Sequence, residues 1–332
     1  MPSDHDPATL AYANLQPEHI FGAVEAVGYR CDGRFLALNS YENRVYQVGI
    51  EDDTPIVVKF YRPGRWSDAA IIEEHEFSME LADAELPVVA PLEHNESSLH
   101  RHGDFRLAIY PRRGGRAPDL DNLELLDQLG RLIARIHLIG ATCDFTERPS
   151  VDIESYGIRS RDYLLENDFI PLELQPAYES VADHVLDGVA ACYERAGRVA
   201  DLRLHADFHP GNVLVSDDRV HIVDLDDTRH GPAVQDLWMF LSGDHSEQAP
   251  QLAALLDGYE LFRPFDACEL HLIEALRSLR IMHYAAWLAR RWGDPAFKIA
   301  FPWFAAHRYW EEHVLSLREQ VALMQEPPLS LP

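Results

Sequence analysis

The dominant spacing of apolar residues changes close to residue 119 of this chain of 332 residues. Before that point the chain contains short runs of β-branched residues, some with two-residue alternation, as in RVYQVGI (residues 44–50). After it, apolar residues recur every three or four positions over long stretches. Alternation is typical of half-buried strands, and the longer period is typical of amphipathic helices. The chain is therefore predicted to be an α+β protein with a β-rich first part and a mainly helical second part.

The first part is predicted to contain several strands and one helix. Residues 34–50 read as a strand, a polar turn and an alternating strand, and residues 55–61 read as a short strand. Residues 67–85 carry apolar side chains at helical spacing, and Ser67 or Asp68 is the expected N-cap of that helix.

A hinge is predicted just after residue 111. Residues 104–111 read as a strand that stops at Pro111, and the sequence RRGGRAP follows. We therefore predict a bilobal chain, with an N-terminal lobe over residues 1–111 and a C-terminal lobe over residues 112–332.

The second part is predicted to be helical apart from one β-hairpin. NVLV (residues 212–215) and HIVDL (residues 221–225) flank the polar SDDR and read as its two strands. Gly140 and Gly197 are expected to close the first two helices. Helices are predicted over residues 122–140, 175–197, 234–243, 251–262 and 266–292.

Charge and composition exclude several classes of partner. The formal net charge is -26, and a surface that acidic repels nucleic acid and anionic lipid. No apolar run is long enough to span a membrane, and the acidic N-terminal stretch does not resemble a signal peptide. The four cysteines have no close spacing, which fits a reducing compartment. We expect a cytoplasmic protein and, since no long heptad pattern occurs, a monomer.

The stretch LHADFHPGNVLV (residues 204–215) predicts the chemistry of the chain. Asp207 and Asn212 lie five positions apart in a loop before a strand, and Asp224 ends the next strand. Asn212 and Asp224 offer the hard oxygen ligands that Mg²⁺ prefers. Asp207 could accept the proton of an attacking hydroxyl, which is the arrangement of protein kinases. Asp207 and Asp224 are therefore predicted to be catalytic, and Asn212 and Asp224 to bind the metal.

The first part supplies matching candidates for a nucleotide site. Lys59 ends a β-branched strand, where it could pair with nucleotide phosphates, and Glu74 in the following helix could hold it. The turn NSYEN lies where a loop over the phosphates is expected, although it contains no glycine. Its contacts would come from backbone N–H groups and from Ser40 or Asn43.

Structural interpretations compete with these functional ones. Asp207 and Asn212 could cap a turn. His205 and His209 could be metal ligands, but Pro-Gly follows them and favours structural roles, with His209 close enough to touch a transferred phosphate. Asp236 could cap a helix or could accept hydrogen bonds from the backbone of the catalytic loop.

The acidic run after the hairpin is open to two interpretations as well. Asp226 and Asp227 could form a solvated run, or they could line the substrate site and attract a cationic acceptor.

These motifs together resemble a known family. LHADFHPGNVLV and IVDLDD look like the aminoglycoside-phosphotransferase-like kinases, which share the bilobal protein-kinase fold. Further motifs make the chain similar to the bacterial stress response kinase A family over about residues 33–329. They are LNSYENRVYQV, VVKFYRPGRW, EEHEF, DLDDTRHGPAVQDLW, LARRWGDPAF and QEPPL.

The resemblance implies an ATP- and Mg²⁺-dependent serine/threonine protein kinase that acts in stress protection and autophosphorylates. It implies that Asp207 is the catalytic base and that Lys59 and Glu74 form an ion pair at the nucleotide. It also places Ser40 at the ATP phosphates and Tyr110, with its two neighbours in the chain, at the adenine. Protein hydroxyls of Ser or Thr are the acceptors that it implies.

Two departures from ordinary protein kinases keep other functions open. The loop over the phosphates lacks glycine, and only seven residues separate Asp224 from Pro232, so a long activation segment is absent. A small-molecule kinase of the same fold, acting on homoserine, choline or an aminoglycoside, would use identical catalytic residues. A metal-dependent hydrolase would need further His ligands, and a pseudokinase would bind nucleotide without turnover.

Overall fold

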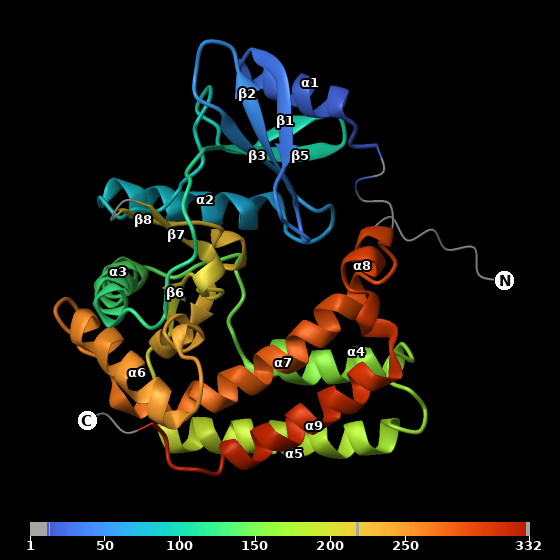
Figure 1. Ribbon diagram of the computed structural model, residues 1–332, viewed down its shortest axis with the longest axis vertical. Helices are drawn as coiled ribbons and strands as arrows, with labels where there is room; N and C mark the ends of the chain where they lie inside the picture. Colours follow the sequence, from blue (N-terminus) through green and yellow to red (C-terminus); the bar gives the residue numbers. More distant parts are fainter. Residues whose placement is uncertain (1–11, 13, 217–218, 330–332) are drawn as a thin grey trace. The chain divides into compact units, whose positions relative to one another are not determined.

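A computed structural model describes residues 12, 14–216 and 219–329 of the chain (Figure 1). Most of the acidic N-terminal stretch, and Asp217 and Asp218 of the predicted hairpin turn, lie outside the described residues. The chain forms two compact units. The sheet unit comprises Met1–Ala117, Gly211–Asp226 and Gly293–Ala296, and the helical unit comprises Pro118–Pro210, Asp227–Trp292 and Phe297–Pro332.

A five-stranded antiparallel sheet forms the centre of the sheet unit, with strand order β1-β2-β3-β5-β4. The predicted strands are confirmed, whereas the short β4 was not predicted. The strands are β1 (Cys31–Ala37), β2 (Arg44–Ile50), β3 (Ile56–Phe60), β4 (His100–His102) and β5 (Phe105–Pro111).

Two helices accompany this sheet. Helix α1 (Pro17–Val27) was not predicted, although Pro17 at its first turn and Gly28 just past its end are typical helix signals. Helix α2 (Asp68–Asp83) confirms the predicted helix, and the Ser67 side chain caps it by accepting a hydrogen bond from the N–H of Ala70.

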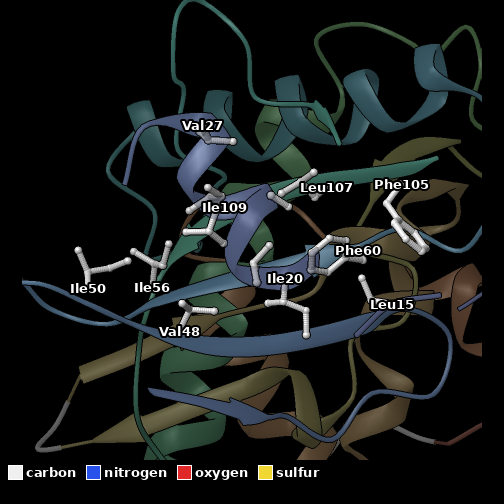
Figure 2. Close-up of a cluster of buried hydrophobic side chains, with 13 residues drawn as sticks. Leu15, Ile20, Val27, Val48, Ile50, Ile56, Phe60, Phe105, Leu107 and Ile109 are labelled. Atoms are coloured by element: carbon white, nitrogen blue, oxygen red, sulfur yellow. The ribbon is translucent and has the colours of Figure 1, made fainter. Parts of the chain in front are cut away.

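The core of the sheet unit joins helix α1 to the sheet. Figure 2 shows this cluster, in which side chains of α1, such as Ile20, meet those of the strands, such as Val48 and Phe60. A second, smaller cluster joins Ile71 of α2 to Tyr61 and Ala108. Burial of these apolar side chains fixes α2, and therefore Glu74, against the strand that carries Lys59.

The β-hairpin of β7 (Val213–Ser216) and β8 (Arg219–Ile222) belongs to the sheet unit by its contacts. The N–H of Ile222 donates to the carbonyl of Pro87, and the N–H of Val89 donates to the carbonyl of Ile222, both over 2.9 Å. The hairpin itself was predicted, but its second strand spans residues 219–222 and not 221–225, so Asp224 follows the strand and does not end it. The predicted lobe boundary after residue 111 stays a prediction, and the observed units differ from it because distant segments return to the sheet.

The helical unit contains two small groups of packed helices and a short two-stranded sheet. Helices α3 and α6 pack against each other, and α5, α7 and α9 pack together, with α4 against α7 (Figure 1). Its elements are α3 (Leu123–Gly140), α4 (Arg159–Glu166), α5 (Gln175–Ala196), β6 (Leu202–Leu204), β9 (Arg229–Gly231), α6 (His245–Tyr259), α7 (Ile273–Arg290) and α9 (His307–Leu323). A further short helix, α8, spans Pro295–Ala300.

Two helix predictions in this unit need correction. The predicted helix over residues 234–243 is wrong, because the segment forms 3₁₀ turns over Ala233–Asp236 and Trp238–Phe240. The predicted helix over residues 266–292 begins with a 3₁₀ stretch and becomes α-helical only at Ile273.

The two glycines that were expected to end helices behave differently. Gly197 follows α5 with a φ of 70°, as predicted. Gly140 is the last residue of α3, and a Cβ there would lie 2.1 Å from the carbonyl oxygen of Arg203. Glycine at position 140 therefore permits close approach of two backbones. No helix within the described ranges is long and apolar enough to cross a membrane.

Candidate active site

The residues predicted to bind a nucleotide and its metal gather around one pocket of the sheet unit. The pocket has a volume of about 320 Å³. Its polar lining includes Ser40, Asn43, Lys59, Glu74, Tyr110, Asn212 and Asp224. Its apolar lining includes Val45, Val57, Val89 and Leu214. A wall with both kinds of side chain suits a ligand that has a flat ring at one end and negative charge at the other.

Lys59 is a buried cation surrounded by carboxylates. It is 6% exposed, and its Nζ lies 2.9 Å from Asp226 Oδ1, 3.3 Å from Asp224 Oδ1 and 3.5 Å from Glu74 Oε1. Burial alone would lower the pKa of Lys59, but the three carboxylates outweigh it and raise that pKa well above its usual value. Lys59 is therefore charged, and its partner Glu74 is the one that the sequence predicted.

Asp226 is part of this buried cluster. It is 4% exposed, and besides Lys59 it contacts the guanidinium of Arg65, which follows β3. The interpretation as a solvated acidic run is therefore wrong for Asp226. Asp227 belongs to the helical unit, where its side chain is partly exposed and its Oδ1 lies 3.4 Å from Arg229 Nη2.

The glycine-free loop between β1 and β2 is shaped by its own polar side chains. Asn43 is 3% exposed, and its side-chain oxygen accepts a hydrogen bond of 3.1 Å from the N–H of Arg62. Ser40 lines the pocket and is partly exposed. The Asn43 side chain thus holds the loop, and direct contact of Ser40 or Asn43 with a nucleotide stays a prediction.

Tyr110 lines the pocket, but its hydroxyl is engaged within the sheet unit. The hydroxyls of Tyr110 and Tyr61 lie 3.0 Å apart, and the Tyr61 hydroxyl lies 2.6 Å from Nε2 of His75. The other ring nitrogen of His75 lies 2.8 Å from the Ser98 hydroxyl. The Tyr110 hydroxyl is therefore part of a chain of hydrogen bonds within the sheet unit, and the contact of Tyr110 with an adenine ring stays a prediction.

The two predicted metal ligands extend from the same end of the β7–β8 hairpin. The strand register pairs Val213 with Ile222, and the N–H of Val223 donates to the carbonyl of Asn212 over 3.0 Å. Asp224 follows in the left-handed region with a φ of 61°, a strained conformation for a residue other than glycine. An amide oxygen and a carboxylate at one hairpin end form a donor set that fits Mg²⁺ with phosphate and water as its other ligands.

Asp207 lies in the helical unit, in the loop after β6. Its Oδ1 accepts a hydrogen bond of 2.5 Å from Nη1 of Arg280 on α7, and Oδ2 lies 3.7 Å from Nε2 of His209. The Asp207 side chain is 26% exposed, so part of it is accessible to solvent. Along the chain, Asp207 precedes the pocket residue Asn212 by five positions.

Asp236 holds the backbone just before Asp207. Its carboxylate accepts hydrogen bonds from the N–H groups of His205 and Ala206, over 2.9 and 2.7 Å, and lies 3.2 Å from Nε2 of His137. Ala206 has a φ of 65°, and Gln235 donates to its carbonyl. The contacts therefore confirm that Asp236 accepts hydrogen bonds from the backbone of the loop. The other interpretation, a helix cap, is wrong, because the Asp236 carboxylate caps no helix.

The two loop histidines have different surroundings. His205 is 1% exposed and stacks on Phe208, with ring centroids 4.7 Å apart. Within the described residues, no group of three or more His, Cys, Asp or Glu side chains could hold a metal by itself. A hydrolytic metal centre at these histidines would need such a group, so the contacts favour structural roles for His205.

Several polar and charged residues near the site were not predicted to take part in it. Arg62 and Arg65 lie in VVKFYRPGRW and Gln235 lies in DLDDTRHGPAVQDLW, but their contacts with Asn43, Asp226 and Ala206 were not predicted. Arg280, which contacts Asp207, lies in none of the quoted motifs, and its place in the amphipathic pattern of α7 was its signal, because an arginine near the buried face of a helix needs a partner.

Sequence comparison places the chain in one family. The family described as "Phosphotransferase enzyme family" matches residues 34–271. The chain is 43% identical over 322 residues to "Stress response kinase A" of Salmonella choleraesuis, covering 97% of each chain. It is also 42% identical over 324 residues to the Escherichia coli protein of that name, covering 98% of each chain. A Salmonella typhimurium relative, 43% identical over 97% of each chain, is named "Serine/threonine protein kinase RdoA".

Solved structures share the fold at low sequence identity. An amicoumacin kinase in complex with AMP-PNP and Ca²⁺ matches with a TM-score of 0.75 and 17% identity, over 98% of each chain. A microcompartment-associated aminopropanol kinase matches with a TM-score of 0.67 and 16% identity, over 92% of this chain and 96% of the other. The predicted α+β kinase-like fold is thereby confirmed. The chain belongs to the phosphotransferase enzyme family, together with relatives named stress response kinase A, and is an enzyme that transfers phosphate.

Proposed function

We propose that this enzyme is an ATP- and Mg²⁺-dependent serine/threonine protein kinase of the bacterial stress response, which also phosphorylates itself. The names of its relatives, at 42–43% identity over nearly the whole chain, support this assignment. We further propose that it acts as a monomer in the cytoplasm, as its composition predicts.

The observation that carries the proposal is the buried Lys59 beside three carboxylates on the wall of the pocket. A polyphosphate bound there would meet one fixed cation whose position Glu74 and Asp226 hold. In phosphoryl transfer such positioning and charge stabilisation supply most of the rate gain. The apolar wall of Val45, Val57 and Leu214 would take the adenine ring.

Asn212 and Asp224 are the residues that would hold Mg²⁺. When bound, the ion would neutralise charge on the phosphates of the nucleotide. Asp224 is the more exposed of the three carboxylates around Lys59, at 55% of its side chain. It can therefore turn to a metal while Glu74 and Asp226 keep Lys59 in place.

Asp207 would act as the base for the acceptor hydroxyl. Its Oδ1 accepts a hydrogen bond from Arg280, its Oδ2 lies 3.7 Å from Nε2 of His209, and the side chain is 26% exposed. This carboxylate would accept the proton as the hydroxyl attacks the terminal phosphate of ATP.

A small-molecule kinase of the same fold is the second candidate. The short segment from Asp224 to Pro232 supports it, because little chain is present there to bind a peptide acceptor. Structures of the same fold include an aminopropanol kinase and a choline kinase, at 16% and 14% identity.

Labelled ATP separates the two candidates. The purified protein is incubated with ATP and Mg²⁺ and with casein or myelin basic protein, beside an Asp207→Ala control. Label on Ser or Thr of these acceptors or of the enzyme itself, absent from the control, is the result we expect. ATP consumption only when small hydroxyl metabolites are added, with no protein label, would replace the protein kinase assignment with the second candidate.

A further inference from the structure

The loop that would cover the nucleotide phosphates has no glycine between residues 38 and 43. Such loops ordinarily use glycine because its backbone reaches conformations that let several N–H groups approach a phosphate. A loop without glycine needs another means of holding its backbone in a binding conformation. The contacts around Tyr41, Glu42 and Asn43 supply one.

Two arginines hold the backbone carbonyls of this loop. Arg62 Nε donates to the Glu42 carbonyl over 3.0 Å, and Arg62 Nη2 lies 3.5 Å from the Tyr41 carbonyl. Arg44 Nη1 donates to the carbonyls of Tyr41 and Asn43 over 3.2 and 3.4 Å. Every backbone carbonyl from residue 41 to residue 43 therefore lies within hydrogen-bond distance of a guanidinium, and these contacts hold the backbone of the loop in one conformation.

Asp294 is the shared counterion of the two arginines. Its Oδ2 lies 2.9 Å from Arg62 Nη2 and 3.6 Å from Arg44 Nη2. Its Oδ1 accepts a hydrogen bond of 3.0 Å from the N–H of Ala296, at the start of α8. Asp294 is 8% exposed and Arg62 is 5% exposed, so the pair is shielded from water. Oδ1 of Asp294 thus binds the start of α8, and Oδ2 binds the two arginines.

We infer that Asp294 is a positioning residue for the nucleotide phosphates, acting through Arg62 and Arg44 on the loop of residues 38–43. The inference rests on the proposed function, which places the phosphates beside that loop and Lys59. Asp294 stands 232 positions after Arg62, yet its segment, Gly293–Ala296, belongs to the sheet unit. Arg62 would keep the Glu42 carboxylate, 3.1 Å from its Nε, but loss of the Asp294 charge would remove the carboxylate that the two guanidiniums share and would weaken their hold on the loop carbonyls.

The inference is tested by comparing ligands with and without phosphates. Asp294→Asn removes the charge but keeps an N-cap side chain for the N–H of Ala296, since Asn caps helices about as well as Asp. Binding of ADP and of adenosine, both with Mg²⁺ present, is measured by titration calorimetry. We expect Asp294→Asn to weaken ADP about ten-fold, a loss of about 1.4 kcal/mol, and to change adenosine binding less than two-fold.

Asp68→Asn is the matched control. Asp68 also pairs with an arginine of the sheet unit, Arg106, over 3.0 Å, but it does not contact the loop. Asp68→Asn should therefore leave the affinities for both ligands unchanged. Unchanged ADP affinity in Asp294→Asn, or equal losses for ADP and adenosine, would overturn the inference while leaving the proposed function intact.

Two further outcomes are decisive. If wild-type protein bound ADP no more tightly than adenosine, the proposed placement of the phosphates would be wrong. The inference about Asp294 would then be wrong as well. If Asp294→Asn did not fold, the same two titrations would be made with Arg44→Met, because the Arg44 side chain is partly exposed and is easier to replace. A selective loss of ADP affinity in Arg44→Met would support the inference, and an unchanged affinity would overturn it.

Discussion

The candidate catalytic residues of the two units differ in charge, in burial and in the number of charged partners. In the sheet unit a buried lysine, Lys59, is surrounded by three carboxylates, each within 3.5 Å. In the helical unit a carboxylate, Asp207, meets one arginine, and both side chains are partly exposed, at 26% and 38%. The first arrangement fixes a cation before any ligand binds. The second leaves the carboxylate partly exposed, which suits a group that would take up a proton during the reaction.

The largest expected effect is that of Asp207→Asn. If Asp207 is the base, phosphate transfer should fall by roughly a thousand-fold, the order of magnitude for general base catalysis. ADP affinity should stay unchanged, because the nucleotide pocket belongs to the sheet unit. Steady-state transfer and ADP titration are the two measurements. If ADP affinity fell by the same factor as the rate, Asp207 would contribute to nucleotide binding, and the comparison drawn above between the two units would be wrong.

Lys59→Met should change stability as well as activity. Removing the cation leaves Glu74, Asp224 and Asp226 close together, and breaking such a buried cluster costs about 3 kcal/mol of unfolding free energy. Urea unfolding with and without Mg²⁺ measures this. We expect millimolar Mg²⁺ to recover part of the loss in the variant and to change the wild type less, because a divalent cation would neutralise the same carboxylates. Equal effects of Mg²⁺ on both proteins would contradict this account.

Arg280→Met should have a smaller effect that is confined to the chemical step. Without Arg280, Oδ1 of Asp207 loses its donor and the carboxylate can rotate, so kcat should fall about ten-fold while the KM for ATP is unchanged. Added guanidinium ion should recover part of the rate.

Arg277→Met is the matched control for Arg280. Arg277 lies on the same helix and pairs with Glu274 over 3.1 Å, so its replacement should leave kcat within two-fold and guanidinium without effect. If Arg280→Met were as active as the wild type, Arg280 would not orient the base.

The smallest expected effect concerns the pH dependence of stability in the helical unit. Burial lowers the pKa of His313 to about 4 and that of His283 to about 3, whereas burial raises the pKa of Glu269 to about 7. Between the unfolded values of 4.5 for Glu and 6.5 for His, unfolding therefore takes up two protons at the histidines and releases one at Glu269. These three groups together make the unit less stable as the pH falls through this window, by about 1.4 kcal/mol per pH unit.

His313→Gln tests this sign. The variant should lose stability at pH 7, because His313 stacks on Tyr178 and Tyr309. Its unfolding free energy should nevertheless fall less steeply than that of the wild type between pH 6.5 and 5, measured by urea unfolding. Parallel pH profiles for the two proteins would rule out a neutral, buried His313. The Lys59 cluster has the opposite sign, since a raised lysine pKa contributes stability that is lost only above pH 10.5.

Local signals carried most of the successful predictions. The strands, the hairpin and α2 follow from hydrophobic period, and the Lys59–Glu74 pair follows from its spacing along a strand and a helix. The 3₁₀ turns around Asp236 were mistaken for a helix, because its carboxylate binds the backbone 30 residues earlier and not its own first turn. The helix propensity of residues 234–243 contains no information on a hydrogen-bond partner so far away in the sequence.

The contacts that were missed join residues far apart in the sequence. Arg65 reaches Asp226 over 161 positions, Arg280 reaches Asp207 over 73, and Arg62 reaches Asp294 over 232. No periodicity pairs such residues, since the fold alone brings them together. The acidic run illustrates the difficulty: Asp226 and Asp227 are neighbours in sequence, yet Asp226 is buried in the sheet unit and Asp227 is partly exposed in the helical unit.

The sheet unit is assembled from three separate stretches of chain, which matters during synthesis on the ribosome. When residue 117 has been made, Lys59 has Glu74 as a partner but neither Asp224 nor Asp226, and Arg62 lacks Asp294. At a translation rate of roughly 5–20 residues per second, the last of these partners follows about 10–40 s later. The five strands of the sheet are therefore complete long before Lys59 and Arg62 have these carboxylate partners, which come only when almost the whole polypeptide has been made.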